Sequence, residues 1–323
     1  MLINSLYTIA GLCLLIFGAD RFVVGAASIA RSLNISPLII GLTIVGIATS
    51  APEVLVGSVA ALDGKTALAV GNAIGSNIAN IGLVLGVSAL ACPLVVKSLT
   101  LRREFLVMCA ATGVAFFVLL DGQLDRLDGL ILIVCLVAAM LWIIQLAKAS
   151  SKSDPLVNEF EHELAEEQSI SIGKSCLFLF IGLTLLLIGA ELLVRGAVAI
   201  AQEFGLSDLV IGLTIVAVGT SLPELAASVS SAMKNEADIA IGNIIGSNMF
   251  NMLMVLGVPA LIQPAEVGAD VMHRDFPIMI FLTLLMGWMV FFHGRGKFDR
   301  VEGGFLFLCF IAYQYWLFSS ISV

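Results

Sequence analysis

The chain carries two copies of one pattern, and this internal repeat limits its fold more than any other feature of the sequence. At an offset of 171 residues, GLTIVGIATSAPE at 41–53 aligns with GLTIVAVGTSLPE at 212–224. Over 41–90 and 212–261, 24 of the 50 aligned positions are identical without a gap. The same register extends on both sides and, after a three-residue insertion, pairs DRLDG with DRVEG. The fold must therefore contain two equivalent halves.

Apolar residues dominate both halves. Hydrophobic residues make up 59% of the 323 residues, charged residues make up 12%, and the mean hydropathy is +1.07. A soluble domain has about 45–50% apolar and about 25% charged residues, so the composition predicts an integral membrane protein. The apolar runs have the length of helical spans and lack the alternation of an outer-membrane barrel. We therefore expect an all-α fold.

Each half contains five predicted membrane spans. They lie at 4–29, 38–61, 66–91, 104–120 and 127–147, and at 173–200, 209–233, 238–262, 276–293 and 302–319. The first span lacks the basic stretch and cleavage site of a signal peptide, so we expect it to be a retained helix. Because five is odd, the halves enter the membrane from opposite sides, which predicts ten helices in two inverted repeats.

One long polar stretch joins the halves. We expect an N-terminal five-helix repeat at 1–147, a linker at 148–171 and a C-terminal five-helix repeat at 172–323. The acidic run of the linker is interpreted as a solvated helix face, with a cation-sensing patch as the alternative.

Positive charges predict the orientation in the membrane. Of the 16 Lys and Arg residues, 11 lie in loops on the linker side and 3 on the other side. The remaining two, Arg21 and Arg195, lie within or near the ends of the first spans. The positive-inside rule then predicts a cytoplasmic linker and both termini outside, in a plasma or bacterial inner membrane.

Charge and motif content argue against several functions. The net charge of −8 and the lack of a basic stripe argue against nucleic acid as a partner. The six cysteines are scattered singly, so we interpret them as small apolar packing residues and not as ligands or disulfides. The sequence contains neither H-E-x-x-H nor G-x-S-x-G, and we expect no enzyme activity and no cofactor.

The second span of each half contains the motif T-S-x-P-E, which places a proline and a carboxylate at membrane depth. Because proline removes a backbone donor and clashes with the preceding turn, we expect breaks at Pro52 and Pro223. The freed carbonyls, the neighbouring hydroxyls and the carboxylates of Glu53 and Glu224 are all hard oxygen donors. Such donors select Na⁺, Ca²⁺ and similar cations. Broken helices at a repeat interface are also where secondary transporters bind ions.

The third span of each half contains G-N-x-x-G-S-N-x-x-N, and we expect it to be broken as well. Ser76 and Asn80 lie four residues apart on one helix face, as do Ser247 and Asn251. The glycines of this motif would let the helix approach another backbone closely; they are Gly71, Gly75, Gly242 and Gly246. The motif therefore adds polar donors where space is available.

Many of these polar residues also have a structural interpretation. Hydroxyls and amides within spans often only hold helices together, and a lone Ser76 or Asn80 would more often do so. We interpret Asn72 and Asn243 as such helix contacts. Three further pairs are interpreted structurally: Asn77 with Asn248 as caps of helix breaks, and Asp20 with Glu191 and Arg21 with Arg195 as structural or interfacial charges beside helix ends. Two glutamates at equivalent places in inverted halves instead favour a site, since the symmetry brings both towards the midplane.

The two motif pairs together resemble the paired α-repeats of the calcium/cation antiporter superfamily. In this sequence they are GIATSAPE with GNAIGSNIAN and GTSLPE with GNIIGSNMFN. The length, the ten spans and the linker resemble its prokaryotic sodium/calcium exchanger branch over essentially the whole chain. The resemblance implies exchange of Na⁺ for Ca²⁺ by alternating access, in which the first span of each half slides past the other eight helices.

The resemblance also assigns ligands. It implies a calcium site formed by Glu53, Glu224, Thr49 and Thr220. It implies flanking sodium sites formed by Ser50, Ser76, Ser221, Ser247 and the carbonyl of Ala217, with Asn80 and Asn251 completing the central cluster. Some family members, including potassium-dependent exchangers, carry Asp where this chain has Asn251, so we expect transport to be independent of potassium.

The charges of the site suggest how exchange is coupled. Two carboxylates neutralise one Ca²⁺ or two Na⁺, so shared ligands make the two ions compete. A further Na⁺, as the family implies, would make the cycle electrogenic. A proton/calcium antiporter is the alternative because glutamates that bind cations also bind protons, and an ion channel is a less favoured one. The predicted partners are Ca²⁺, Na⁺ and the lipid bilayer.

Overall fold

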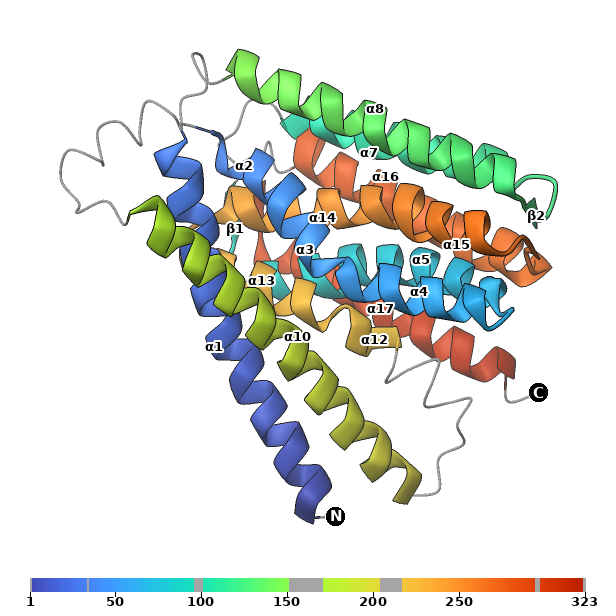
Figure 1. Ribbon diagram of the computed structural model, residues 1–323, viewed down its shortest axis with the longest axis horizontal. Helices are drawn as coiled ribbons and strands as arrows, with labels where there is room; N and C mark the ends of the chain where they lie inside the picture. The colour runs from blue at the N-terminus through green and yellow to red at the C-terminus, as the bar shows by residue number, and fades with distance from the viewer. Residues whose placement is uncertain are drawn as a thin grey trace.

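The computed structural model describes residues 2–33, 35–95, 101–150, 171–203, 217–293 and 297–321. These residues are nearly all helical, apart from turns and two pairs of two-residue strands (Figure 1). Eight of the described helices are long and apolar enough to cross a membrane, which confirms an all-α, multi-pass membrane fold. The fourth predicted span forms α7, which is not among the eight, and the seventh lies partly outside the described residues. Ten membrane helices therefore remain a prediction.

Where both halves are described, their helices follow the same order, and the second half has two π-helical segments without a counterpart in the described first half. In the first half they are α1 (Leu2–Ser32), α2 (Pro37–Ile40), η1 (Gly41–Val45), α3 (Gly46–Thr49), α4 (Ala51–Leu62), α5 (Thr66–Ala79), η2 (Asn80–Leu85), α6 (Gly86–Ala91), α7 (Leu101–Val118) and α8 (Arg126–Ser150). In the second half they are α10 (Ile172–Glu203), α12 (Ala217–Thr220), α13 (Leu222–Met233), α14 (Ala237–Phe250), η4 (Asn251–Val255), α15 (Gly257–Ile262), η5 (Val271–Asp275), α16 (Phe276–Trp288), η6 (Met289–His293) and α17 (Arg300–Ile321). The segments labelled η are π-helical.

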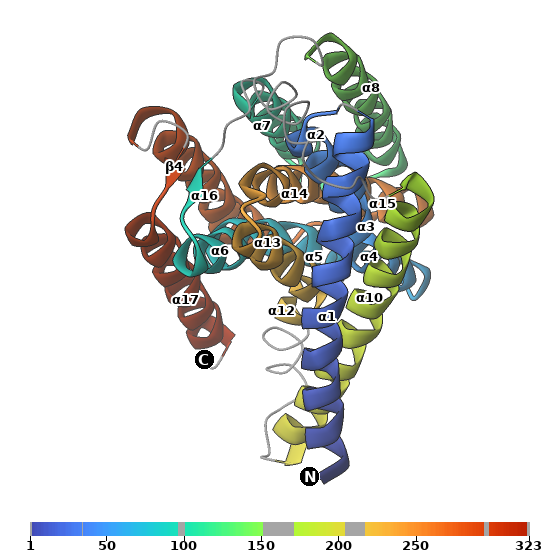
Figure 2. The same ribbon diagram turned by 90° about the vertical axis from the view of Figure 1, so that its left-hand side faces the viewer.

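The first helices of the two halves, α1 and α10, form an antiparallel pair that runs obliquely to the other helices (Figures 1 and 2). Each carries a glycine every seven residues, so the glycines lie along one helix face. A Cβ added at Gly18 would lie 2.8 Å from the backbone nitrogen of Leu186, and one at Gly189 would lie 2.8 Å from that of Leu15. The two backbones therefore touch, which larger side chains at these positions would prevent.

The second span of each half is interrupted, as predicted. The helix stops at Ser50 (φ −81°, ψ 3°) and restarts as α4 with Pro52 in its first turn. Ser221 (φ −87°, ψ 6°) occupies the same place before α13 and Pro223. Each interruption falls two residues before the proline and not at it, because the proline ring clashes with the preceding turn.

The third span of each half is not broken, which corrects the prediction. The helix α5 continues into η2 and α6, and Asn80 at the junction keeps helical angles (φ −60°, ψ −40°). The segments α14, η4 and α15 repeat this order, with Asn251 at the junction (φ −60°, ψ −44°). A π-helical segment fits an extra residue into a helix without ending it. The third span therefore has no break that would need a cap.

The two halves are interleaved at their ends. Strand β1 (Leu94–Val95), after the third span of the first half, pairs antiparallel with β4 (Lys297–Phe298), which precedes α17. Strand β3 (Ala265–Glu266) pairs in the same way with β2 (Gln123–Leu124), which precedes α8. Accordingly α17 packs on η2 and α6, while α8 packs on α15 and η4. The last helix of each half, α8 or α17, thus covers the third span of the other half, so one apolar core is shared by both halves.

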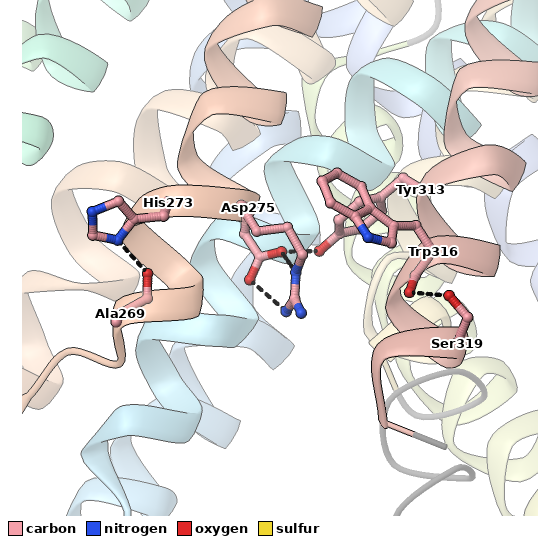
Figure 3. Close-up of polar contacts among 7 residues, drawn as sticks. Ala269, His273, Asp275, Tyr313, Trp316 and Ser319 are labelled. Atoms are coloured by element: carbon pink, nitrogen blue, oxygen red, sulfur yellow. Dashed lines mark hydrogen bonds and ion pairs between the residues drawn. The ribbon is translucent and has the colours of Figure 1, made fainter. Parts of the chain in front are cut away.

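A polar cluster links η5 to α17 in the second half (Figure 3). The guanidinium of Arg274 donates to Asp275 Oδ1 at 2.8 Å, and the hydroxyl of Tyr313 donates to the same oxygen at 3.1 Å. Asp275 is buried, so these donors compensate a charge that has left water. Tyr313 corresponds to Ala139 in the first half, so the repeat does not duplicate this cluster.

Candidate cation-binding site

The interrupted second spans of the two halves face each other. Glu53 and Glu224 lie in the first turns of α4 and α13, and both residues are at most 1% exposed. Ser50, at the interruption of the first half, donates a hydrogen bond to Glu224 Oε1 at 3.2 Å. The two carboxylates are close enough for their charges to interact. One buried region thus contains a carboxylate from each half.

The threonines that end α3 and α12 also lie against the opposite half. The Thr49 hydroxyl lies 3.1 Å from the Val45 carbonyl oxygen and 3.0 Å from Asn243 Oδ1, and it can donate to either. It also lies 3.5 Å from Ser247 Oγ. Thr220 lies beside the carboxylate of Glu53. Each threonine oxygen is therefore shared between the halves.

Among the buried side-chain oxygens of the second and third spans, seven that belong to predicted ligands lack a hydrogen-bond partner in the described part of the chain. They are both carboxylate oxygens of Glu53, Oε2 of Glu224, the hydroxyls of Ser76 and Ser221, and Oδ1 of Asn80 and Asn251. One such buried polar atom costs about 1–3 kcal/mol, so seven together need compensation. A bound cation would supply it, since Ca²⁺ takes six to eight oxygen ligands at about 2.3–2.6 Å. Ser88 Oγ of α6 and Ser231 Oγ of α13, which are not predicted ligands, also lack a partner among the described residues.

Four asparagines join the third spans of the two halves. Asn251 Nδ2 donates to Asn77 Oδ1 at 3.0 Å, and Asn80 Nδ2 donates to Asn248 Oδ1 at 3.2 Å. Asn77 Nδ2 donates to the backbone carbonyl of Asn248 at 3.2 Å. The prediction that Asn77 and Asn248 cap helix breaks is therefore wrong, because both bond across the interface between the halves.

The preceding asparagines hold the third span to the second, as predicted. Asn72 Nδ2 contacts the Glu53 carbonyl oxygen at 3.4 Å, and Asn243 Nδ2 contacts that of Glu224 at 3.4 Å. Asn243 Nδ2 also donates to Ser228 Oγ at 2.9 Å. Ser228 is not among the residues predicted from the sequence, although its place four residues after Glu224, on the same helix face, could have indicated it.

Several predicted residues lie apart from the carboxylates or are only partly described. The acidic residues of the first helices pair elsewhere, Asp20 with Lys234 and Glu191 with Arg195, which supports their structural interpretation. Ala217 begins α12, and its carbonyl stays a predicted ligand.

The glycines of the third-span motif behave differently in the two halves. A Cβ at Gly242 or Gly246 would collide with backbone atoms of Leu38 or Leu42, so the predicted close approach is confirmed in the second half. Around Gly71 and Gly75 no described atom lies within 4 Å of such a Cβ. The repeat aligns Leu38 and Leu42 with positions 209 and 213, which would be the neighbours of Gly71 and Gly75 but lie outside the described residues.

A cavity of about 320 Å³ approaches the site from the side of α10. Its lining includes Thr220 and Gly219 at the interruption of the second half, Pro52 of α4, and Glu191 of α10. Thr220, a predicted ligand, therefore borders a cavity, whereas its counterpart Thr49 is fully buried.

Comparison with known proteins gives one consistent family. The model of the family described as sodium/calcium exchanger protein matches residues 3–145 and 174–319, which together are most of the chain. A protein of Alkalimonas amylolytica named "Putative antiporter CaxA" is 47% identical over 321 residues, which are 99% of this chain and 100% of that protein. The sodium/calcium exchanger MaX1 of Methanosarcina acetivorans is 30% identical over 98% of this chain and 99% of its own.

A solved structure has the same fold. The sodium-calcium exchanger NCX_Mj, soaked with 2.5 mM Na⁺ and 0.1 mM Ca²⁺, matches with a TM-score of 0.82 and 34% sequence identity. The match covers 97% of each chain.

Proposed function

The chain belongs to the sodium/calcium exchanger protein family of the calcium/cation antiporter superfamily, and we propose that it exchanges Na⁺ for Ca²⁺ across a cell membrane. Its matched relatives are named as exchangers and antiporters, so the chain is a cation antiporter and not an enzyme. The observation that carries the proposal is the set of seven buried oxygens around two carboxylates from opposite halves.

The proposed Ca²⁺ ligands are the carboxylates of Glu53 and Glu224 and the oxygens of Thr49 and Thr220. Support comes from the burial of both glutamates and from the contact of each threonine with the opposite half. The proposed sodium sites on either side use Ser50, Ser76, Ser221 and Ser247 with the carbonyl of Ala217, and Asn80 and Asn251 complete the centre. These neutral oxygens suit Na⁺, which carries one charge.

Competition for the carboxylates would couple the two ions. The pair of negative charges balances one Ca²⁺ or two Na⁺, and a low-dielectric site disfavours the two carboxylates without a cation. A further Na⁺ at a serine site would make each cycle move charge across the membrane, so the rate would depend on membrane potential. Asn251 in place of a carboxylate supports transport without potassium.

The proposed architecture has ten membrane helices in two inverted five-helix repeats, 1–147 and 172–323, joined by a cytoplasmic linker at 148–171. Both termini would lie outside, in a plasma or bacterial inner membrane, on the distribution of Lys and Arg. Alternating access would come from movement of α1 and α10 together. Support comes from their backbone contact and from their oblique course beside the other helices (Figure 2).

Radiolabelled Ca²⁺ uptake into proteoliposomes tests the function. A Na⁺ gradient directed out of the vesicles should drive Ca²⁺ uptake, and net positive charge should leave the vesicles during uptake. Added K⁺ should have no effect. Glu53→Gln and Glu224→Gln should each reduce Na⁺-driven uptake at least a hundredfold, since each leaves one negative charge to balance a divalent cation. The matched control Glu266→Gln changes an exposed carboxylate in β3 and should keep full activity.

Other outcomes identify the competing functions. Uptake driven by a pH gradient and not by Na⁺ would show a proton/calcium antiporter. Flux that needs no counter-ion would show a channel. Normal Na⁺-driven uptake in both glutamine variants would refute the assigned site.

A further inference from the structure

The amide groups of the four asparagines between the third spans are all buried, and their bonds cross the interface in a fixed order. Asn80 and Asn251, the proposed central ligands, use their Nδ2 groups to bond Asn248 and Asn77 of the opposite half. None of the four residues is more than 2% exposed. The two bonds are equivalent under the repeat, since each joins the second Asn of one G-S-N-x-x-N motif to the first Asn of the other.

The direction of these bonds determines which end of each ligand amide remains available. A carboxamide offers donors at Nδ2 and an acceptor at Oδ1. With Nδ2 engaged across the interface, Oδ1 of Asn80 and Oδ1 of Asn251 have no partner among the described residues. If an amide turned over, its NH₂ group would face the cation and repel it. An oxygen ligand therefore requires an acceptor that holds the nitrogen.

We propose that Asn77 and Asn248 are positioning residues that orient the central ligands of the opposite half, so that Asn251 and Asn80 present oxygen to the cation. The proposal rests on the proposed function of Asn80 and Asn251 as ligands. Asn77 would act through Asn251, and Asn248 through Asn80. Each half would then supply a ligand and also the group that aims the ligand of the other half.

The backbone at the junctions agrees with this role. The N–H of Asn251 bonds the carbonyls of Ser247 and Asn248 at the start of η4, and Asn77 Nδ2 donates to the same Asn248 carbonyl. Asn80 has the equivalent backbone bonds, to Ser76 and Asn77. The ligand and its positioning residue are thus held at the point where α-helix becomes π-helix in each half.

Asn248→Ala is the sharpest single test. The variant keeps the backbone carbonyl that accepts Asn77, and Asn248 Nδ2 has no partner in the described residues, so only the acceptor for Asn80 is lost. We expect the apparent Ca²⁺ affinity in Na⁺-driven uptake to fall about tenfold, with little change in maximal rate. Asn80→Ala should lower the affinity by at least as much. If Asn248→Ala does not fold, Asn248→Ser, which is too short to reach Asn80, replaces it.

Double variants separate positioning from simple packing. If the bonds act as proposed, the affinity losses of Asn248→Ala and Asn80→Ala will be strongly non-additive, and so will those of Asn77→Ala and Asn251→Ala. The same-helix pairs, Asn77 with Asn80 and Asn248 with Asn251, should couple much less. A packing role would instead lower the melting temperature with unchanged Ca²⁺ affinity, or couple all pairs equally, and either result would overturn the proposal.

The outcome also distinguishes failure of the positioning role from failure of the site. If Asn80→Ala weakens Ca²⁺ binding and Asn248→Ala does not, the ligand assignment stands and the positioning role is refuted. If Asn80→Ala and Asn251→Ala both leave the affinity unchanged, neither is a ligand and both ideas fail at these residues.

Discussion

The helices α1 and α10 are equivalent in the repeat, yet they are attached to the rest of the molecule differently. Asp20 of α1 pairs with Lys234 at 2.6 Å, and Arg31 of α1 pairs with Glu236 at 2.8 Å. Both partners lie at the turn between α13 and α14. In the other half, Glu191 of α10 pairs within its own helix, with Arg195.

The turn sequences explain this difference. Lys234 corresponds to Asp63 in the first half, and Glu236 corresponds to Lys65, so both charges are inverted between the turns. Glu191 would therefore meet a like charge at Asp63, where Asp20 meets an opposite charge at Lys234. The repeat conserves the acidic residue of the helix but not its partner.

The cavities beside α1 and α10 also differ, in the residues that line them. On the α1 side, a cavity of about 540 Å³ is lined mostly by apolar residues, with Ser230 and the Asp20–Lys234 pair, and none of the predicted ligands is in its lining. On the α10 side, the cavity of about 320 Å³ reaches Thr220. The chemistry of the site is thus duplicated, whereas the attachment of the first helices and the approach to the site are not.

Reversing the charge of Lys234 should have the largest effect on the attachment of α1. Lys234→Asp gives the second turn the charge of the first and places two carboxylates together. We expect the protein to lose about 1 kcal/mol of stability, because the paired side chains are 31% and 42% exposed and solvent weakens the interaction. The measurement is thermal unfolding of the purified protein.

A charge swap provides the control for that variant. Asp20→Lys combined with Lys234→Asp restores an opposite pair and should recover most of the lost stability. If Lys234→Asp alone is as stable as the parent protein, the ion pair does not hold α1.

Loss of the Ser228 hydroxyl, which only the second half has near the site, should have a smaller effect on stability. Ser228 is buried and accepts from Asn243, but its counterpart is Gly57, where a Cβ would lie only 3.2 Å from Pro259 Cγ and 3.3 Å from Ala69 Cβ. A serine at this place in the first half would therefore fit only if Pro259 and Ala69 moved slightly apart. Ser228→Ala should cost about 1 kcal/mol or less, because Asn243 keeps its contact with the Glu224 carbonyl.

Denaturation of Ser228→Ala and of Ser230→Ala tests this estimate. Ser230 lies on the same helix but is only half-buried, so its variant should be close to the parent protein. Equal stability of the two variants would mean that the Ser228 bond contributes nothing.

Much of the fold and of the site could be predicted from the sequence because it depends on residue type and repetition. Proline in the second span indicated the interruption, and two equivalent glutamates indicated a shared site. The π-helical segments could not be predicted, since no residue pattern separates a π turn from an α turn at Asn80 or Asn251. The crossing of the fifth helices also depends on packing between the halves.

The contacts between the halves were the hardest to predict. Alignment of the repeat shows which residues are equivalent, but not which ones touch across the interface. Asn77 and Asn248 therefore resembled helix caps, although they bond to the opposite half. Ser228 was missed because the residue aligned with it is a glycine.

Equilibrium binding of radiolabelled Ca²⁺ to the purified protein, with and without Na⁺, tests most directly whether the two halves build one shared site. We predict a single class of Ca²⁺ site per chain, displaced by Na⁺ and lost entirely in either Glu53→Gln or Glu224→Gln. If each variant kept half of the bound Ca²⁺ at unchanged affinity, the carboxylates would belong to two independent sites, which would contradict the account.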